Sequence, residues 1–278
     1  MIPTRELGKT NRKVTIFGLG GEGILRTRGY FNEAEAVIKK AVEVGVNYFD
    51  TAPAYQQSRD YLGKYLWNYA KREEIFLASK THERSYDGTM SLVEDSLKRL
   101  NTNYLDLLQL HDLREKEDID KIFSKNGAIH ALEDLRKEGK VRFVGITGHH
   151  DPNILIEAIK RYDFDAVLLC VNAADQHYLP FITTMIPQAR KKGMGVIAMK
   201  VTAQGQALSC ISMEDAFNFS LSQDVDLAII GCKTPQEVEQ NASLANNFKR
   251  LSNEELLNIG NKAKNSVAEM NFFKKEMY

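Results

Sequence analysis

The stretch from Asn47 to Tyr55, NYFDTAPAY, places an ionisable residue, Asp50, at the end of a short apolar run and a tyrosine five positions later. Two further runs end in the same way: IFLAS is followed by Lys80, and LDLLQL is followed by His111. Short apolar runs of this length are typical of buried strands. Polar residues at the carboxyl ends of successive parallel strands meet at one rim of a barrel. We therefore predict that Asp50, Tyr55, Lys80 and His111 lie together.

The same rhythm continues along most of the chain and predicts an α/β fold class. Amphipathic segments separate the strand-like runs; one of them is bounded by a plausible N-cap at Asn32 and a stop signal at Gly45. No Gly-x-Gly-x-x-Gly motif opens a helix, and the polar strand ends are spread over many units, which favours a closed (β/α)8 TIM barrel over an open sheet. The predicted strands end near Gly18, Asp50, Lys80, His111, Thr147, Asn172, Lys200 and Gly231.

The segments outside these eight units complete the predicted architecture. Residues 5–14 predict an N-terminal β-hairpin that covers the bottom of the barrel, and residues 251–270 predict an extra C-terminal helix. No linker or low-complexity tract interrupts the chain, so residues 1–278 are predicted to form a single domain. The charged segment 112–126 is either a wall of the substrate site or a solvated surface loop.

Composition excludes several classes of function. The 278 residues contain 37 basic and 37 acidic side chains, and this balance gives no field for nucleic acid or an anionic membrane. No apolar run approaches the length of a membrane span, and the N-terminus has no signal-peptide core. Three cysteines without metal-ligand spacing predict reduced thiols and a cytoplasmic protein. His149 and His150 are adjacent and lack a third ligand at diagnostic spacing, so no metal is predicted.

The motif Asp50-x-Ala52-x-x-Tyr55, followed by Lys80 and then His111, resembles the catalytic tetrad of the aldo-keto reductases in residue type, order and spacing. The resemblance extends over nearly the whole chain. It implies an NADP-dependent oxidoreductase, with NAD as the alternative cofactor, that reduces small aldehydes or ketones to alcohols with Tyr55 as the proton donor. Each of the four residues alone has an ordinary structural role; their joint occurrence favours catalysis.

The tetrad forms a chemically complete set for this reaction. A phenol has an ordinary pKa of about 10, and a neighbouring ammonium favours the phenolate, so we expect Lys80 to lower the pKa of Tyr55. Asp50 would hold Lys80 charged and oriented. His111 would donate a hydrogen bond to the carbonyl oxygen or assist proton transfer.

The resemblance also implies a cofactor site along the later barrel loops. The implied positions are Gly18, Leu19, Gly20, Asp50, Thr147, Gly148, Asn172, Met199, Lys200, Val201, Thr202, Gln204, Gly231, Cys232, Lys233, Thr234, Glu237, Gln240 and Asn241.

Several of these positions depart from the common family pattern. Gly148 replaces an asparagine, Leu168 replaces a glutamine that grips the nicotinamide amide, and Met199 replaces a stacking aromatic residue. Glu237 stands where NADP-preferring relatives often carry a basic residue. Lys233 can supply the missing charge, so we expect a weaker preference for NADP over NAD.

Two alternatives remain open at this stage. One is a barrel aldolase that uses Lys80 or Lys200 as a Schiff-base lysine. The other is a cofactor-binding regulatory subunit, since potassium-channel β subunits resemble the same family. The sequence leaves the physiological substrate and the oligomeric state undetermined.

Overall fold

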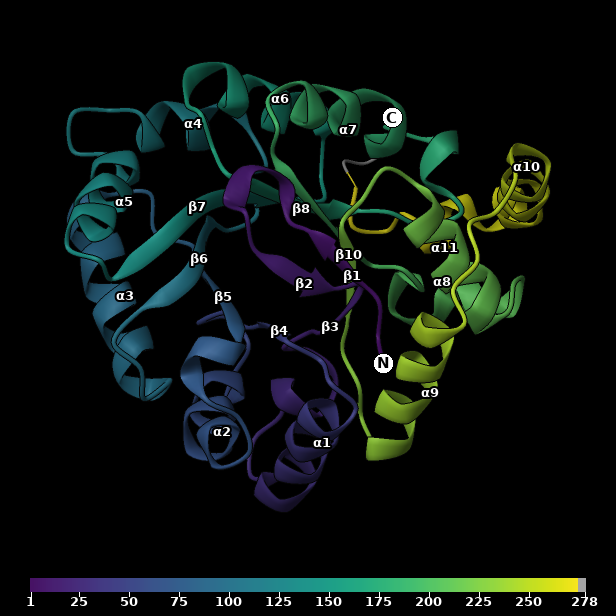
Figure 1. The fold of residues 1–278 in the computed structure, drawn as a ribbon. Helices are drawn as coiled ribbons and strands as arrows, with labels where there is room; N and C mark the ends of the chain where they lie inside the picture. The colour runs from purple at the N-terminus through teal and green to yellow at the C-terminus, as the bar shows by residue number, and fades with distance from the viewer. Residues whose placement is uncertain (275–278) are drawn as a thin grey trace.

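Eight parallel strands close into a barrel in the computed structural model, which describes residues 1–274 (Figure 1). Each strand pairs with the next along the chain, and the pairing of the last strand with the first closes the sheet. The predicted TIM barrel is therefore confirmed. In barrel order the strands are β3 (Phe17–Leu19), β4 (Tyr48–Asp50), β5 (Phe76–Thr81), β6 (Leu105–Leu110), β7 (Val141–Gly148), β8 (Ala166–Cys170), β9 (Gly195–Met199) and β10 (Leu227–Ile230).

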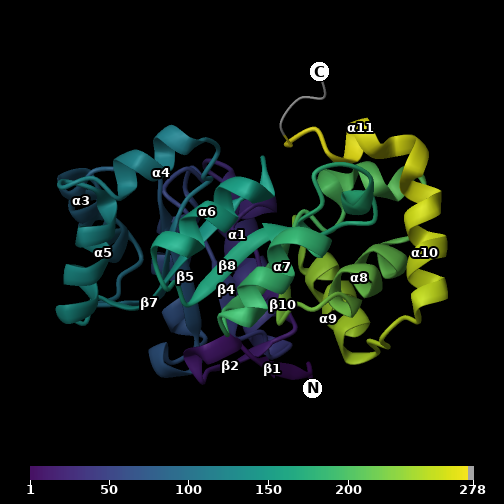
Figure 2. The same cartoon turned by 90° about the horizontal axis from the view of Figure 1, so that it is seen from above.

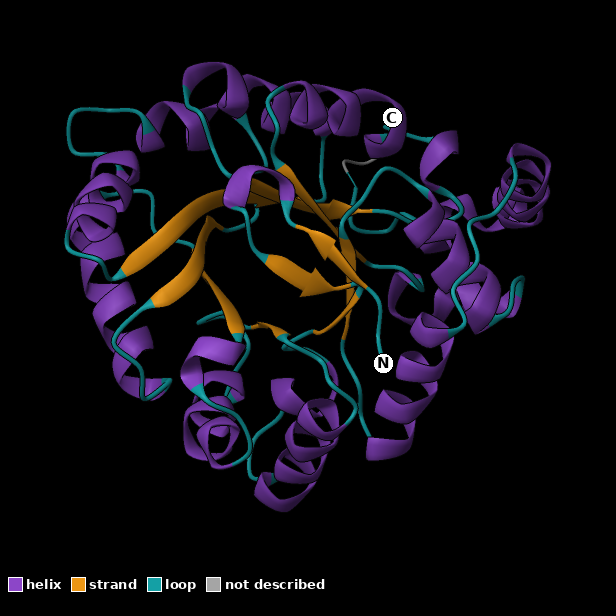
Figure 3. Cartoon of the chain, in the orientation of Figure 1, coloured by secondary structure: helices purple, strands orange, loops and turns teal. Residues whose placement is uncertain are grey.

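Helices form a ring around the strands (Figure 3). Two of them begin as sequence signals indicate: Asp151 and Thr234 cap helices whose first residues are prolines. Asn32 is not a cap, because the first helix already begins at Phe31. Within residues 1–274 no helix has the length and apolar character of a membrane span. The barrel helices are α1 (Phe31–Glu43), α2 (Ser58–Tyr65), α3 (Tyr86–Arg99), α4 (Lys116–Ile122), α5 (Ala128–Lys137), α6 (Pro152–Arg161), α7 (Phe181–Lys191), α8 (Met213–Ser222) and α9 (Pro235–Asn246).

The predicted C-terminal helix is divided into two. Helix α10 (Asn253–Lys262) and helix α11 (Val267–Met270) are separated by a short 3-10 segment, and both lie outside the eight units. The predicted loop 112–126 also differs from expectation, because it contains the short helix α4.

The N-terminal hairpin closes the bottom of the barrel. Strands β1 (Thr4–Glu6) and β2 (Lys13–Thr15) pair in antiparallel fashion. Leu7 and Val14 belong to the apolar cluster that fills the barrel interior. Gly8, at φ +46°, lies so close to β9 that a β-carbon there would approach Gly195 N to 2.1 Å. Figure 2 shows the hairpin at one end of the barrel and α11 at the other, so the hairpin does not cover the carboxyl ends of the strands.

Every second barrel unit carries a side chain at its lower end that accepts a backbone N–H from the preceding unit. Because these groups lie at the bottom rim, they stabilise the closed sheet rather than the site. The four contacts are Asn47 with Thr15 N (2.8 Å), Asp106 with Leu77 N (3.0 Å), Asp165 with Val144 N (2.9 Å) and Asp226 with Val196 N (2.9 Å).

The segment after α11 contacts the loop that follows β8 through a buried ion pair and hydrogen bonds. The Lys274 side chain is fully buried, and its Nζ lies 2.7 Å from Asp175 Oδ1 and 2.6 Å from Tyr178 O. The Asp175 carboxylate also accepts the backbone N–H groups of Phe181 and Ile182 at the start of α7. A buried ion pair with these additional hydrogen bonds fixes the C-terminal segment at the upper face.

Removing a carboxylate of the lower rim should destabilise the fold. Arg190 pairs with Asp226, whose side chain is 8% exposed, and with Asp224, which is 69% exposed. Asp226→Ala should lower the free energy of unfolding by about 1–3 kcal/mol, because the buried N–H of Val196 loses its acceptor and the partly buried Arg190 keeps only the exposed Asp224. Asp224→Ala is the matched control and should change it by less than about 1 kcal/mol. Urea denaturation measures both values; equal losses would contradict a special role of the buried carboxylate.

Candidate active site

The carboxyl ends of neighbouring strands bring Asp50 and Lys80 into direct contact. Asp50 is the last residue of β4, and Lys80 lies near the end of β5. Lys80 Nζ lies 2.5 Å from Asp50 Oδ1 and 3.0 Å from Thr51 O. Both side chains are 1% exposed. The ion pair is thus placed inside the barrel mouth, where the interaction is little screened by solvent.

Tyr55 lies above this pair, between it and His111. Lys80 Nζ is 4.8 Å from the centroid of the Tyr55 ring. The His111 imidazole meets the same ring edge-on, with centroids 5.9 Å apart. Tyr55 belongs to the loop after β4, and His111 directly follows β6. The structure therefore brings together the four residues that the sequence singled out.

Burial dominates the electrostatics of the tetrad. It lowers the pKa of Lys80 and raises the pKa of Asp50, while their ion pair acts against both shifts. Burial and the nearby Asp50 charge raise the pKa of Tyr55 well above its ordinary value. The net lowering expected from Lys80 is not found, because burial, the largest effect, and the charge of Asp50 both raise the pKa of Tyr55. Burial and the charge of Lys80 lower the pKa of His111 to about 3, so its imidazole is neutral near pH 7.

Arg84, which the sequence reading missed, holds the backbone that carries His111. Its Nη2 donates to His111 O at 2.9 Å and to Asp112 O at 3.1 Å, and its Nε lies 2.8 Å from Asp118 on α4. Asp112 is left-handed, at φ +53°, and its N–H donates to Thr147 Oγ1 at 2.8 Å. Only the fold brings these groups together; the sequence signal is no more than a basic residue four positions after Lys80.

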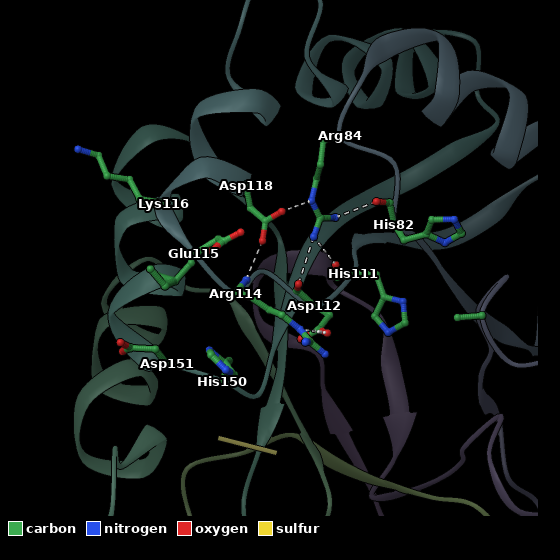
Figure 4. A pocket seen from close by; sticks show the side chains of 12 residues that line it. His82, Arg84, His111, Asp112, Arg114, Glu115, Lys116, Asp118, His150 and Asp151 are labelled. Atoms are coloured by element: carbon green, nitrogen blue, oxygen red, sulfur yellow. Dashed lines mark hydrogen bonds and ion pairs between the residues drawn. The ribbon is translucent and has the colours of Figure 1, made fainter. Parts of the chain in front are cut away.

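A cavity of about 790 Å³ opens beside His111 (Figure 4). The segment that begins at Asp112 forms much of its wall, so the long charged loop faces the site rather than only solvent. Apart from two apolar residues, the lining is charged or imidazole. The lining residues are Ala54, His82, Arg84, His111, Asp112, Arg114, Glu115, Lys116, Asp118, His150, Asp151 and Ile154.

A second cavity, a groove of about 650 Å³, runs from Asp50 and Tyr55 to the start of α9. Twelve of the implied cofactor positions line it: Gly20, Asp50, Met199, Lys200, Val201, Thr202, Gln204, Gly231, Lys233, Glu237, Gln240 and Asn241. Seven implied positions are not among its lining residues: Gly18, Leu19, Thr147, Gly148, Asn172, Cys232 and Thr234.

Close backbone packing shapes this groove. A β-carbon on Gly23, which has φ +68°, would approach Cys232 O to 2.4 Å, and one on Gly231 would approach the Glu22 backbone to 2.7 Å. The loops after β3 and β10 are thus in direct contact. Lys200 Nζ reaches back to Glu22 Oε2 at 3.3 Å. Glu22 is a second charged group that the sequence reading did not assign to the cofactor site.

The start of α9 carries its own carboxylate. Glu237 Oε2 accepts the backbone N–H of Lys233 at 2.6 Å, and Thr234 Oγ1 accepts the N–H of Glu237 at 3.3 Å. Cys232 lies beneath, where it contacts Asn241 Nδ2 at 3.3 Å, and burial raises the pKa of its thiol to about 12. This thiol is therefore a packing group.

The residues present fit an elongated nicotinamide dinucleotide. Lys200 and Lys233 provide cations along the groove. At the start of α9, the N–H groups of Lys233 and Glu237 are already bound to side chains of the same turn. Asn172 Nδ2 is buried and has no hydrogen-bond partner within residues 1–274, but Asn172 lines neither cavity. Leu168 is fully buried in the barrel interior, so the amide grip of the common glutamine has no equivalent at this position.

The neutral state of His111 should appear in the pH dependence of stability. Its pKa is about 3 in the folded chain, against an ordinary 6.5, so the unfolded imidazole binds a proton that the folded one does not. This contribution to stability is fully present above pH 6.5 and is lost as the pH falls toward 3. Compared with His111→Gln, the parent should lose up to about 1.4 kcal/mol per pH unit in this window. Urea titrations from neutral to acidic pH measure the difference; parallel curves would show that His111 is not desolvated.

Comparison with known proteins agrees with this geometry. A model of the Aldo/keto reductase family matches residues 16–216. L-galactose dehydrogenase of Arabidopsis thaliana is 34% identical over 221 residues, which cover 73% of this chain and 66% of that protein. The uncharacterized oxidoreductase YqkF of Bacillus subtilis (strain 168) is 30% identical over 195 residues, covering 64% of this chain and 60% of that protein.

The matched region therefore spans less than two thirds of either relative. Among solved structures, the holo form of aldo-keto reductase AKR11C1 from Bacillus halodurans shares the fold, with a TM-score of 0.78 and 24% identity over 94% of this chain and 96% of that one. Taken with the family match over residues 16–216, these likenesses show that the chain belongs to the aldo/keto reductase family.

Proposed function

We propose that this protein is an NAD(P)H-dependent oxidoreductase that reduces aldehydes or ketones to alcohols, with Tyr55 as the proton donor. The observation that carries the proposal is the buried Asp50–Lys80 pair beneath Tyr55, at the end of the groove and next to His111. Family membership supports the reaction class. We further propose that its substrate is a small-molecule carbonyl and that the protein acts in the cytoplasm.

The four side chains divide the proton chemistry among them. A bound nicotinamide cofactor would supply the hydride to the carbonyl carbon. The raised pKa keeps the Tyr55 hydroxyl protonated until negative charge develops on the carbonyl oxygen. The hydroxyl then gives its proton to that oxygen. The Lys80 ammonium, held by Asp50 and 4.8 Å from the centroid of the Tyr55 ring, offsets part of the cost of forming a phenolate at this buried position.

His111 acts as a hydrogen-bond donor rather than as an acid. Its imidazole is neutral near pH 7 and stands next to the Tyr55 ring. A neutral imidazole can donate one N–H to the carbonyl oxygen and so orient the substrate for hydride transfer. Arg84 and Thr147 keep this imidazole in place through the backbone of residues 111 and 112.

The aldolase alternative is less well supported. A Schiff-base lysine needs an accessible and unprotonated amine. Lys80 is 1% exposed and ion-paired, and Lys200 is 11% exposed and paired with Glu22. Borohydride trapping in the presence of a carbonyl compound would detect such an adduct. A purely regulatory role would be recognised by the absence of turnover with a broad carbonyl panel.

Tyr55→Phe should remove the proton donor and little else. Turnover of a carbonyl substrate should fall by at least about 10²-fold, the lower range for a positioned acid. Fluorescence titration should give nearly the parent affinity for the reduced cofactor. Tyr69→Phe is the matched control, because the Tyr69 hydroxyl contacts Glu35 away from the site. Turnover of Tyr55→Phe close to that of the control would rule out Tyr55 as the acid.

Cofactor preference should respond to the carboxylate at the start of α9. We propose NADP as the cofactor, with a weak preference over NAD, because Glu237 already occupies the backbone N–H of Lys233. Glu237→Arg should raise the NADP/NAD ratio of kcat/KM and of binding affinity, and Lys233→Ala should lower both. Glu239→Arg is the control: it makes the same charge change in the same helix, where Glu239 faces Lys40 instead of the groove.

Unchanged ratios in both Glu237→Arg and Lys233→Ala would mean that this loop does not read the 2′-phosphate. Equal shifts in Glu237→Arg and Glu239→Arg would indicate a general effect of charge rather than a contact.

A further inference from the structure

Arg26, a cation that lines the groove, has no role in the proposed proton chemistry. Arg26 ends the short 3-10 segment Gly23–Arg26 in the loop after β3. Its guanidinium carbon lies 5.4 Å from the centroid of the Tyr55 ring. Arg26 and Tyr55 line the same groove. A ligand whose carbonyl oxygen meets the Tyr55 hydroxyl therefore has its near substituents within reach of this guanidinium.

The present partner of Arg26 is weakly held. Arg26 Nη1 lies 2.9 Å from Glu22 Oε1, and the two side chains are 45% and 30% exposed. Glu22 is shared, because its carboxylate also faces Lys200. An exposed ion pair of this kind contributes little free energy, so another carboxylate can replace Glu22 as the partner of Arg26. A guanidinium offers five N–H donors and binds a carboxylate best in a two-pronged geometry, which the single contact with Glu22 does not use.

The other cations near Tyr55 are already committed. Lys80 is buried against Asp50. On the His111 side, Arg84 is bound to backbone carbonyls and to Asp118, and Arg114 Nε donates to Asp112 at 2.7 Å. Of the two cations that residues 1–274 place over the Tyr55 ring, Lys80 is buried and Arg26 is exposed.

We propose that Arg26 is a specificity-determining residue that binds a carboxylate on the substrate, so that the enzyme prefers short oxo acids to neutral carbonyls of the same size. This inference rests on the proposed reductase function and names its substrate class. In the absence of substrate, the Glu22 carboxylate occupies the place that the carboxylate of the oxo acid takes. The charge of Arg26 is also felt at the phenol: burial raises the pKa of Tyr55, whereas Arg26 acts in the opposite direction.

A matched pair of substrates tests the proposal. Steady-state reduction with NADPH compares 4-oxobutanoate with its methyl ester, which has the same carbonyl and chain but no charge. The parent should favour the acid. Arg26→Met should lower kcat/KM for the acid by about tenfold or more, the size expected for losing one charge-assisted contact, and should leave the ester within about twofold. The change should appear mainly in KM.

Two further variants separate the contact from general charge. Arg28→Met removes the same charge from the same loop and should leave the acid-to-ester ratio unchanged. Glu22→Gln removes the competing carboxylate and should raise the acid-to-ester ratio of kcat/KM, a ratio in which any effect on the cofactor through Lys200 cancels. Equal losses for acid and ester in Arg26→Met, or a matching loss of NADPH affinity in fluorescence titration, would place Arg26 with Tyr55 or the cofactor and overturn the proposal.

A binding measurement keeps this test distinct from the test of the reaction itself. If the parent reduced neither compound, the proposed function would fail. Calorimetric titration with succinate would then still show whether a carboxylate binds at Arg26. The proposal is supported if succinate binds the parent and Arg28→Met with similar affinity and binds Arg26→Met about tenfold more weakly. Absence of binding to the parent, or equal binding to Arg26→Met, rules it out.

Discussion

Closure of the eight-stranded sheet is the constraint on which the rest of the molecule depends. A closed parallel barrel has no edge strands, and all its strands point the same way, so its two ends have different tasks. At the lower end, Asn47, Asp106, Asp165 and Asp226 each accept an amide of the preceding unit, and the hairpin fills the opening with Leu7 and Val14. The contact occurs four times around the eight strands because every second unit provides the accepting side chain. The polar residues at the upper end, such as Asp50 and Lys80, are therefore not needed to stabilise the closed sheet.

At the upper end, closure of the barrel buries two ionised side chains next to each other, which costs desolvation free energy. Asp50 and Lys80 both project from neighbouring strands into a mouth with almost no access to water. Desolvation opposes the ionisation of each, and their mutual attraction opposes desolvation. A phenol placed over this pair meets a low-dielectric environment, and an imidazole beside it stays neutral. In the proposed reaction the phenol is the acid and the neutral imidazole is the hydrogen-bond donor, and burial at the strand ends favours both protonation states.

The barrel and the proximity of Asp50, Tyr55, Lys80 and His111 could be predicted because both depend on local patterns repeated at regular intervals. A polar residue that ends an apolar run, such as Asp50, Lys80 or His111, marks the end of a strand wherever the run is buried. Arg84 could not be found in this way, since its partners, the carbonyls of residues 111 and 112, lie on another strand end. Glu22 and Lys200 are 178 residues apart, and only closure of the barrel makes them neighbours. The expected lowering of the Tyr55 pKa was wrong for a related reason: the sequence shows which charges exist, but not that the phenol is buried or that Asp50 lies 2.5 Å from the ammonium.

The anchor between Lys274 and Asp175 has a consequence for the order in which the chain is made. Asp175 leaves the ribosome with the loop after β8, and its buried cation follows 99 residues later. At synthesis rates of about 5–20 residues per second, the interval is roughly 5–20 s. During this time the start of α7 has a carboxylate without its counter-charge, so this part of the upper rim cannot reach its final packing while the last helices are still being translated. The barrel can close once β10 has been made and pairs with β3, whereas Asp175 gains its counter-charge only when synthesis has passed Lys274.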